Sequence, residues 1–461
     1  MQFNEEFVKK AVTGASLLYK AFPEDHSFSI DTRTLKKGDI FVALQGKQAD
    51  GHNFLAEALK KEAHGLIIAE QKKDCLKNLD KEILKKKLII LVPDTMRALV
   101  DLATAWRAQF DYPVVGITGS VGKTSTKETM SNILDLHGEP YIASLGNQNT
   151  IYGLALNILR MRAHHKIAIF EMGISRRGEM AKLTTMTKPT TAIVTNVGHC
   201  HMEGLGSIID IASEKREIFK YFKEDSIGII NGDQPLLAQV AYTHPVIKFG
   251  SKTTNQIQAR KINITSTHTT FVLKLYKEKY YITLNKNHNG LVFNSLAATA
   301  IGYLLKIPAQ TILDGIQKPV VIAGRFEEKP LKTGKGIIIN DCYNANPESM
   351  KAALVALQAI DTNAQKVAVL GDMLELGVNS PFWHRQLGRF LRKVPSLRKV
   401  ILVGSMVKWT QKTIPVNVQI DMVASWQEAL EKLKGKLDQE SIVLVKGSLG
   451  IGLKNLVDEL V

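Results

Sequence analysis

The chain has 461 residues, 45% of them hydrophobic and 23% charged, which is typical of a globular protein with about three domains. Its apolar runs are far shorter than the roughly 20 residues that a membrane span needs, and its first residues lack the apolar stretch of a secretory signal, so we expect a cytoplasmic protein without a membrane span. The net charge of +16 suits anionic small substrates as well as nucleic acid, but no basic stretch is interleaved with aromatic residues, and we expect no nucleic-acid partner.

The predicted elements form three α/β domains, with boundaries near residues 93 and 326. The first domain, residues 1–93, has a small α/β pattern of short strands and one helix. A helix at 95–109 then leads to a proline break before the next strand. The strands of the first domain are expected at 39–44, 65–69 and 88–92, and its helix at 53–62.

The second domain, residues 94–326, repeats strand, turn and helix. Its strands are continuous apolar runs, which are typical of parallel strands buried on both faces. They lie at 114–118, 167–170, 192–195 and 227–230. Residues 245–286 instead alternate polar and apolar side chains around Lys277-Glu278-Lys279, which predicts an antiparallel hairpin added to this parallel sheet.

The third domain, residues 327–461, contains a second βα series and is expected to be Rossmann-like. Its first helix should begin after Asn346, a favourable N-cap followed by proline. Its strands are expected at 336–340, 367–370, 399–403 and 442–445.

Polar residues capable of chemistry follow the predicted strands again and again. Because ligands of open parallel sheets bind outside the carboxyl ends of the strands, this pattern predicts an active site between the α/β domains. The residues concerned are Thr118-Gly119-Ser120, Glu171, 196–201, Asp341, Asp372 and Lys446.

The strongest motif is GITGSVGKTSTKE at residues 116–128, which follows a strand and opens a helix. Its glycines let backbone N–H groups point at phosphates, and the helix N-terminus adds positive potential. Lys123 is expected to reach the β- and γ-phosphates, and the Thr124 hydroxyl to hold Mg²⁺. The usual first glycine of a P-loop is replaced by Ile117, so the loop is a variant in which nucleotide contacts come from Thr118, Gly119, Ser120, Val121 and Gly122.

Three further side chains are candidates for catalysis. Glu171 ends a buried strand near the P-loop and is expected to bind magnesium or orient water, or else to cap a helix or form a salt bridge. His201 follows another strand in a turn, where a structural histidine is the alternative. Lys215 lies on the apolar stripe of a helix, so it either extends its amine to solvent or is held near a site with an altered charge state.

These motifs occur together in one family. Six segments resemble the Mur ligases, chiefly their central domain. They are residues 116–127, EMG at 171–173, NVGHCHMEGLGS at 196–207, IASEKREIF at 211–219, AGRFE at 323–327 and NDCYNANPESMKAAL at 340–354. Residues 31–54 are similar to the family's uridine-sugar domain. YNANP and VLGDMLELG (369–377) resemble the branch that adds D-alanyl-D-alanine to UDP-N-acetylmuramoyl-tripeptide.

The resemblance implies an ATP-dependent ligase that forms an acyl phosphate on the tripeptide and is expected to be a monomer using two Mg²⁺ ions. By resemblance, His201 and a carbamylated Lys215 would hold the second ion, while Lys123, Glu171 and Arg325 would act on the phosphates. The nucleotide would further contact Asn294, Asp341 and Asn344. The UDP-sugar would contact Thr32, Arg33, Asn149 and Thr150, and the dipeptide Asp372, Glu375, Lys446 and Ser448.

Three features depart from the family pattern. Leu449 stands where the family usually has arginine, which makes Lys446 the nearest cation for a substrate carboxylate. Thr150 and Ala155 replace an asparagine and a proline, and His288 and Asn289 lie farther than usual before Asn294. The alternatives are a ligase similar to folylpolyglutamate synthase, which lacks a domain like residues 31–54, and a P-loop NTPase of another kind, which would leave Lys215 and YNANP unexplained.

Overall fold

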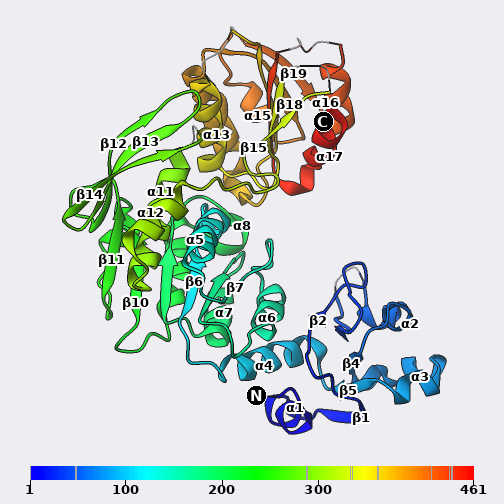
Figure 1. The fold of residues 1–461 in the computed structure, drawn as a ribbon. Helices are drawn as coiled ribbons and strands as arrows, with labels where there is room; N and C mark the ends of the chain where they lie inside the picture. Colours follow the sequence, from blue (N-terminus) through cyan, green and yellow to red (C-terminus); the bar gives the residue numbers. More distant parts are fainter. Residues whose placement is uncertain are drawn as a thin grey trace.

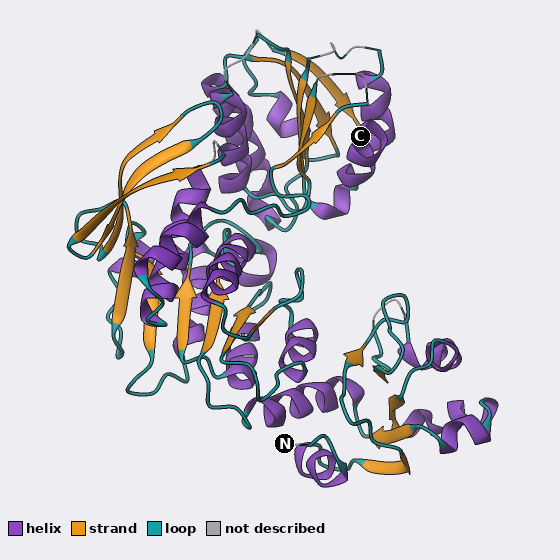
Figure 2. Cartoon of the chain, in the orientation of Figure 1, coloured by secondary structure: helices purple, strands orange, loops and turns teal. Residues whose placement is uncertain are grey.

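A computed structural model gives the fold and describes residues 2–46, 49–286, 289–332, 334, 336–360, 363–416, 418–435, 437 and 440–461. In these residues the strands form three separate sheets, each with helices packed on it (Figures 1 and 2). The sheets are mainly parallel, so the predicted α/β class is confirmed. No helix in the described part of the chain is both long and apolar enough to span a membrane.

The amino-terminal sheet has the strand order β1-β5-β4-β3-β2, with β1 antiparallel to β5 and the other neighbours parallel. The predicted strands β3, β4 and β5 are fully buried, as their apolar runs indicated. Strand β1 alternates exposed and half-buried residues and was not predicted, because it has no apolar run. The elements are α1 (Glu5–Ala11), β1 (Ser16–Lys20), β2 (Phe28–Ser29), β3 (Ile40–Val42), α2 (Leu55–Lys60), β4 (Gly65–Ala69), α3 (Lys81–Lys85) and β5 (Leu88–Val92).

The central sheet has the order β14-β13-β12-β11-β10-β9-β6-β8-β7. The predicted strands 114–118, 167–170, 192–195 and 227–230 all occur within a residue of their expected bounds and pair in parallel. The strands are β6 (Val114–Thr118), β7 (Tyr141–Ala143), β8 (Ile167–Glu171), β9 (Thr191–Val194), β10 (Ile227–Asn231), β11 (Val246–Gly250), β12 (Ile257–Ile264), β13 (Thr269–Leu275) and β14 (Glu278–Leu284).

The predicted hairpin is present as β13 and β14, and β12 adds a third antiparallel strand to it. Strand β12 also pairs in parallel with β11, so the hairpin continues the central sheet instead of forming a sheet of its own. Figure 1 shows these strands extending from the central domain toward α13 (Pro347–Ala359) of the carboxyl-terminal domain.

Helices cover both faces of the central sheet. One face packs against α5, α11 and α12 through the alternate strand residues Val115, Ile117 and Ile169. The other packs against α4, α6, α7 and α9 through residues that include Phe170 and Val194. The helices are α4 (Thr95–Arg107), α5 (Lys123–His137), α6 (Ile151–Leu159), α7 (Glu179–Thr187), α8 (Met202–Leu205), α9 (Ile208–Arg216), α10 (Pro235–Ala238), α11 (Asn289–Leu304) and α12 (Ala309–Gln317).

The carboxyl-terminal sheet has the order β15-β16-β20-β17-β18-β19, parallel except for β15 at its edge. Asn346 caps α13 by accepting from the Ser349 amide, and Pro347 occupies the first turn, as predicted. The elements are β15 (Glu327–Pro330), β16 (Ile337–Asp341), α13 (Pro347–Ala359), β17 (Lys366–Gly371), α14 (Ser380–Phe390), β18 (Leu397–Val403), α15 (Lys408–Gln411), β19 (Gln419–Val423), α16 (Trp426–Leu433), β20 (Ile442–Lys446) and α17 (Leu453–Leu460).

Helix α4 joins the first two sheets, because it packs on α1 as well as on α6 and α7 (Figure 1). His26 lies in this junction: its ring stacks on Phe3 at 5.0 Å and meets Trp106 edge-on at 4.5 Å. The imidazole is buried, and this burial, with the charge of Arg162 nearby, lowers the pKa of His26 to about 4.

Replacing His26 with glutamine is expected to reduce the acid sensitivity of the fold. The unfolded imidazole takes up a proton near pH 6.5, whereas the folded one resists protonation down to about pH 4, so its contribution to stability is complete above pH 6.5 and is lost toward pH 4. At pH 5 the loss is on the order of 2 kcal/mol. Melting temperatures at pH 7 and pH 5 should therefore fall less in the variant than in the unmodified chain, and an equal fall in both would contradict the assignment.

Candidate active site

The P-loop between β6 and α5 depends on glycine at two positions. Gly119 has φ of +156°, and a Cβ there would lie 1.9 Å from the Thr195 hydroxyl oxygen, so no larger residue fits. Gly122 has φ of +86° and immediately precedes the first residue of α5. A Cβ at Gly122 would lie 2.6 Å from Asn294 Oδ1, which places the predicted nucleotide contact Asn294 directly beside the loop.

Lys123 is the first residue of α5, and its ammonium Nζ donates to the Gly119 carbonyl at 2.7 Å. Burial lowers the pKa of Lys123, the carboxylate of Glu171 opposes that change, and the charge of Arg325 adds to it. The amine therefore lies curled over the loop, close to an acid and to a second cation. This is the arrangement expected of a lysine that contacts phosphate oxygens.

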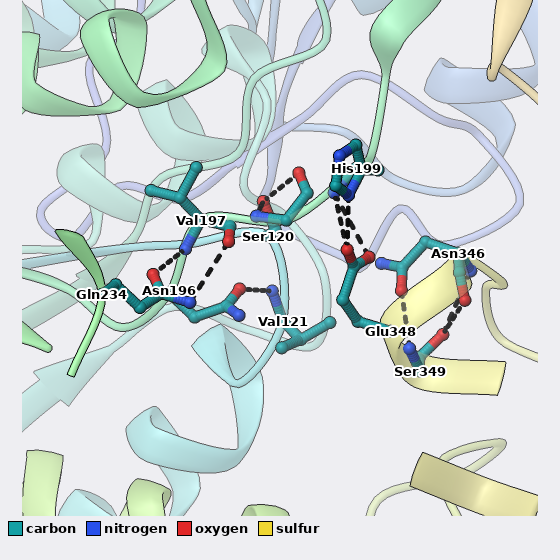
Figure 3. A network of polar contacts seen from close by, with 10 residues as sticks. Ser120, Val121, Asn196, Val197, His199, Gln234, Asn346, Glu348 and Ser349 are labelled. Atoms are coloured by element: carbon teal, nitrogen blue, oxygen red, sulfur yellow. Dashed lines mark hydrogen bonds and ion pairs between the residues drawn. The ribbon is translucent and has the colours of Figure 1, made fainter. Parts of the chain in front are cut away.

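The segment that follows β9 holds the P-loop in place, an interaction that the sequence did not reveal (Figure 3). Asn196 accepts from the Val121 amide through its side-chain Oδ1 at 3.1 Å, and its backbone carbonyl accepts from the Ser120 amide at 3.0 Å. The Ser120 hydroxyl donates to the Gly198 carbonyl at 3.0 Å and accepts from the Gly198 amide at 2.9 Å. In the sequence, only the position of Asn196 after a buried strand pointed to a role for this residue at the site.

Glu171 ends β8 and is completely buried, with both carboxylate oxygens in use. Oε2 accepts from the Thr124 hydroxyl at 2.8 Å, and Oε1 accepts from the Asn149 amide at 2.7 Å. Two adjacent ligands of an octahedral Mg²⁺ lie about 3.0 Å apart when each bond is about 2.1 Å long. The Thr124 and Glu171 oxygens therefore fit one Mg²⁺ ion, whose remaining ligands would be phosphate and water oxygens.

His201 and Lys215 reach the same cavity from two helices. His201 is the N-cap of α8, and Lys215 lies in the last turn of α9 with only 2% of its surface exposed. Burial and the neighbouring charge of Lys123 lower the pKa of Lys215 to about 8, against the opposing effects of Cys200 and Glu214. A lysine with a pKa of about 8 is neutral in roughly a tenth of the molecules at pH 7, far more than an exposed lysine, and the neutral amine is the form that reacts with carbon dioxide.

A cavity of about 1300 Å³ lies between the central and carboxyl-terminal domains. Most of the predicted site residues line it, and Thr118, Gly119, Thr124 and Glu171 are P-loop or strand-end residues next to the lining ones. Most of the residues that the sequence predicts for the site therefore lie around one cavity in the fold. The predicted residues in the lining are Ser120, Val121, Gly122, Lys123, Asn149, Thr150, His201, Lys215, Asn294, Arg325, Asp341, Asn344 and Lys446.

Arg325 and Asp341 form the carboxyl-terminal side of this cavity. The Arg325 guanidinium stacks over the Tyr343 ring at 4.3 Å, which holds it at the cavity wall. Asp341 Oδ2 lies 2.8 Å from the Nζ of Lys446, which also donates to the Asn344 carbonyl at 2.9 Å. Lys446 is 2% exposed, so its charge is largely matched within the protein.

The sequence alone predicts that losing Lys446 raises the Michaelis constant for D-alanyl-D-alanine more than that for ATP, and the pairing of Lys446 with Asp341 changes this expectation. Lys446→Ala would leave Asp341, the expected ribose contact, without its cation, so we expect the Michaelis constant for ATP to rise at least as much as that for D-alanyl-D-alanine. Steady-state titration of both substrates measures the two effects. A rise confined to the dipeptide would instead support Lys446 as the replacement for the arginine missing at Leu449.

Three predicted dipeptide contacts do not line the cavity. The Asp372 carboxylate accepts from the amides of Ser405, Met406 and Val407 at 2.8–3.1 Å, and it is 3% exposed, so it holds that loop in place. The Ser448 hydroxyl accepts from the Leu374 amide at 2.9 Å. The Glu375 carboxylate contacts His201 Nδ1, and that contact lowers the pKa of Glu375.

The predicted uridine-sugar contacts lie on two domains. Thr32 and Arg33 belong to the amino-terminal domain and lie outside this cavity; the Thr32 carbonyl accepts from Lys61, and Arg33 pairs with Asp31. Asn149 and Thr150 line the cavity at the start of α6. The histidine of the stretched nucleotide pattern, His288, lies outside the described residues.

Comparison with known proteins matches three family models along the chain. Residues 25–107 match the Mur ligase family, catalytic domain; residues 117–302 match the Mur ligase middle domain; and residues 324–449 match the Mur ligase, glutamate ligase domain.

Individual relatives match over almost the whole chain. A UDP-N-acetylmuramoyl-tripeptide–D-alanyl-D-alanine ligase of Bacillus subtilis (strain 168) is 32% identical over 95% of this chain and 93% of its own. The crystal structure of MurF from Acinetobacter baumannii covers 100% of this chain and 99% of its own, with 26% identity and a TM-score of 0.84. The MurF ligase of Thermotoga maritima in complex with ADP covers 94% and 96%, with 27% identity and a TM-score of 0.78.

Proposed function

The chain belongs to the Mur ligase family, and from this premise we propose the reaction of its cavity. It is an ATP-dependent, ADP-forming ligase that joins D-alanyl-D-alanine to UDP-N-acetylmuramoyl-tripeptide in peptidoglycan synthesis. The observation that carries this proposal is the gathering of the P-loop Lys123 and Arg325 around one cavity between two domains, beside the Thr124 and Glu171 oxygens that fit Mg²⁺. Anionic substrates and a phosphoryl group in transfer need such a concentration of cations.

The reaction begins with phosphoryl transfer from ATP to the terminal carboxylate of the tripeptide. Lys123 and the P-loop amides neutralise the β- and γ-phosphates, and Arg325 reaches the γ-phosphate from the opposite wall. Asn294, Asp341 and Asn344 hold the nucleoside. This chemistry depends mainly on positioning and charge. The residues therefore act by holding the attacking carboxylate oxygen and the leaving oxygen of ADP in line with the γ-phosphorus.

Magnesium binding is assigned to two sets of residues. Thr124 and Glu171 would hold one ion, and His201 with a carbamylated Lys215 would hold a second ion nearer to the acceptor. Bound Mg²⁺ neutralises charge on the transferring phosphoryl group. The hydroxyl and carboxylate oxygens of the first set are ligands that Mg²⁺ prefers, and the neutral amine of Lys215 can supply a further oxygen ligand after carbamylation.

The amine of D-alanyl-D-alanine then attacks the acyl phosphate, and the tetrahedral intermediate expels phosphate to give the amide. The division of labour follows the domains: residues 1–93 bind the UDP-sugar through Thr32 and Arg33, residues 94–326 bind ATP, and residues 327–461 bind the dipeptide. Asn149 and Thr150 complete the UDP-sugar site, and Lys446 lines the cavity on the dipeptide side. Asp372 and Ser448 support that side by holding the loops behind it. We further propose that the enzyme acts as a monomer in the cytoplasm, where nucleotide-linked precursors and ATP are available.

The proposal is tested by measuring phosphate release from ATP with UDP-N-acetylmuramoyl-tripeptide, with D-alanyl-D-alanine, and with both together. Release should require both substrates and should match the amount of UDP-pentapeptide formed. Release that needs neither substrate would indicate a P-loop NTPase of another kind. Release that depends on a folate and glutamate would indicate the folylpolyglutamate-synthase activity.

A further inference from the structure

The segment between β9 and α9, residues 196–207, contacts the carboxyl-terminal domain through two histidine–carboxylate pairs. His199 Nδ1 lies 2.6 Å from the carboxylate of Glu348, whose oxygens also accept from the His199 amide at 3.2 Å (Figure 3). Two residues later, His201 Nδ1 contacts the carboxylate of Glu375. The two acids come from different elements, since Glu348 is in the first turn of α13 and Glu375 follows β17.

The two pairs differ in which partner faces the cavity, because Glu348 lines it in one pair and His201 lines it in the other. His201 lines the catalytic cavity, whereas Glu375 does not and lies behind the imidazole. A second bond fixes the same contact, because the Glu203 amide donates to the Glu375 carbonyl at 3.1 Å. His201 and Glu375 both adopt left-handed backbone conformations, with φ of +52° and +61°, which non-glycine residues adopt rarely. The backbone is thus built to bring these two side chains together.

We propose that Glu375 is a positioning residue that orients His201 as a metal ligand across the domain interface. This inference rests on the proposed role of His201 in binding Mg²⁺. When Nδ1 donates its hydrogen to a carboxylate, the Nε2 lone pair is left free for a cation, and the ring is fixed in direction. The carboxylate also makes the imidazole a stronger ligand.

The position of Glu375 gives this contact a consequence for the reaction. His201 belongs to the central domain, which carries the P-loop, and Glu375 belongs to the domain assigned to the incoming dipeptide. The metal ligand is therefore fully oriented only when the carboxyl-terminal domain is docked on α8. Completion of the metal site depends in this way on the arrangement of the two domains that must both contact the substrates.

Manganese binding to the full-length chain tests this role without relying on turnover. Mn²⁺ is titrated by electron paramagnetic resonance in the presence of a non-hydrolysable ATP analogue, for the unmodified chain and for Glu375→Ala, Glu375→Gln and His201→Ala. Glu375→Ala should weaken Mn²⁺ binding by on the order of 10-fold, close to the effect of His201→Ala. Glu375→Gln should fall between, because its amide oxygen still accepts the Nδ1 hydrogen but carries no charge.

Glu348→Gln is the matched control, because it weakens the neighbouring histidine–carboxylate contact of the same segment without touching His201. Its Mn²⁺ affinity should stay close to that of the unmodified chain. Equal weakening in Glu348→Gln and Glu375→Gln would show that domain docking in general matters and would overturn the specific role of Glu375. Unchanged Mn²⁺ affinity in Glu375→Ala and Glu375→Gln would overturn it as well.

Two further outcomes separate this inference from the proposed function. If His201→Ala binds Mn²⁺ as well as the unmodified chain, His201 is not a ligand, and the inference fails while ligation can remain. If Glu375→Gln raises the Michaelis constant for D-alanyl-D-alanine and leaves Mn²⁺ binding unchanged, Glu375 contacts the dipeptide instead. Because glutamine keeps the size of the side chain, this variant remains informative even if Glu375→Ala does not fold.

Discussion

Replacing Lys123 with alanine is expected to lower turnover by on the order of 100-fold or more, even at saturating ATP. The Lys123 ammonium is half-buried at the start of α5, 2.7 Å from the Gly119 carbonyl and near both Glu171 and Arg325. The substitution removes a positive charge from the place where charge develops on the phosphoryl group. The loss should therefore appear in the catalytic rate more than in the Michaelis constant for ATP.

The comparison for this variant is Lys220→Ala, which removes an exposed lysine of the same domain that pairs with Glu217 at 3.4 Å. Its turnover should equal that of the unmodified chain. Near-normal turnover of Lys123→Ala at saturating ATP would mean that the loop binds something other than the reacting phosphate.

Replacing Lys215 with alanine is expected to nearly abolish ligation while the fold remains intact. The amine lies on the cavity wall with a pKa lowered to about 8, so it can add carbon dioxide, lose a proton and become an anionic carbamate. A carbamate supplies the oxygen ligand that a lysine otherwise lacks. Labelled bicarbonate should give a carbamate signal in nuclear magnetic resonance that is absent in the variant.

Chemical rescue distinguishes this role from that of a simple cation. A small carboxylic acid should restore part of the activity of Lys215→Ala, because the shortened side chain leaves room for it. Lys215→Met fills the same space and should be equally inactive but not rescued. Full ligation by Lys215→Ala would remove Lys215 from the site, and inactivity without rescue or a carbamate signal would leave it as a plain cation near the phosphates.

Much of the fold could be predicted because burial leaves a mark on the sequence. Strands buried on both faces, such as β4 and β6, are continuous apolar runs and were found within a residue of their bounds. Strands β1 and β15 were missed because they lie at sheet edges, where half of their residues face solvent and no apolar run is required. The third antiparallel strand, β12, was hidden because its second half alternates exposed and half-buried residues.

The site was predictable where a residue type follows a strand, and less so where two domains meet. Lys123, Glu171 and Lys215 stand out through local context, namely a P-loop, a strand end and an apolar helix face. The contact of Glu348 with His199 spans 149 positions of the sequence, and the contact of Glu375 with His201 spans 174. No local pattern specifies such pairs, because they depend on how the carboxyl-terminal domain packs on the central one.

Activation of the tripeptide's terminal carboxylate as an acyl phosphate is tested most directly by following one of that carboxylate's oxygens. UDP-N-acetylmuramoyl-tripeptide labelled with oxygen-18 in its terminal carboxylate is incubated with ATP, D-alanyl-D-alanine and the unmodified chain, and the released phosphate is analysed by mass spectrometry. An acyl phosphate formed at the P-loop transfers one labelled oxygen to each phosphate as the amide forms. Phosphate that carries one oxygen-18 for each UDP-pentapeptide made is the predicted result, and unlabelled phosphate accompanying the same product would contradict the mechanism.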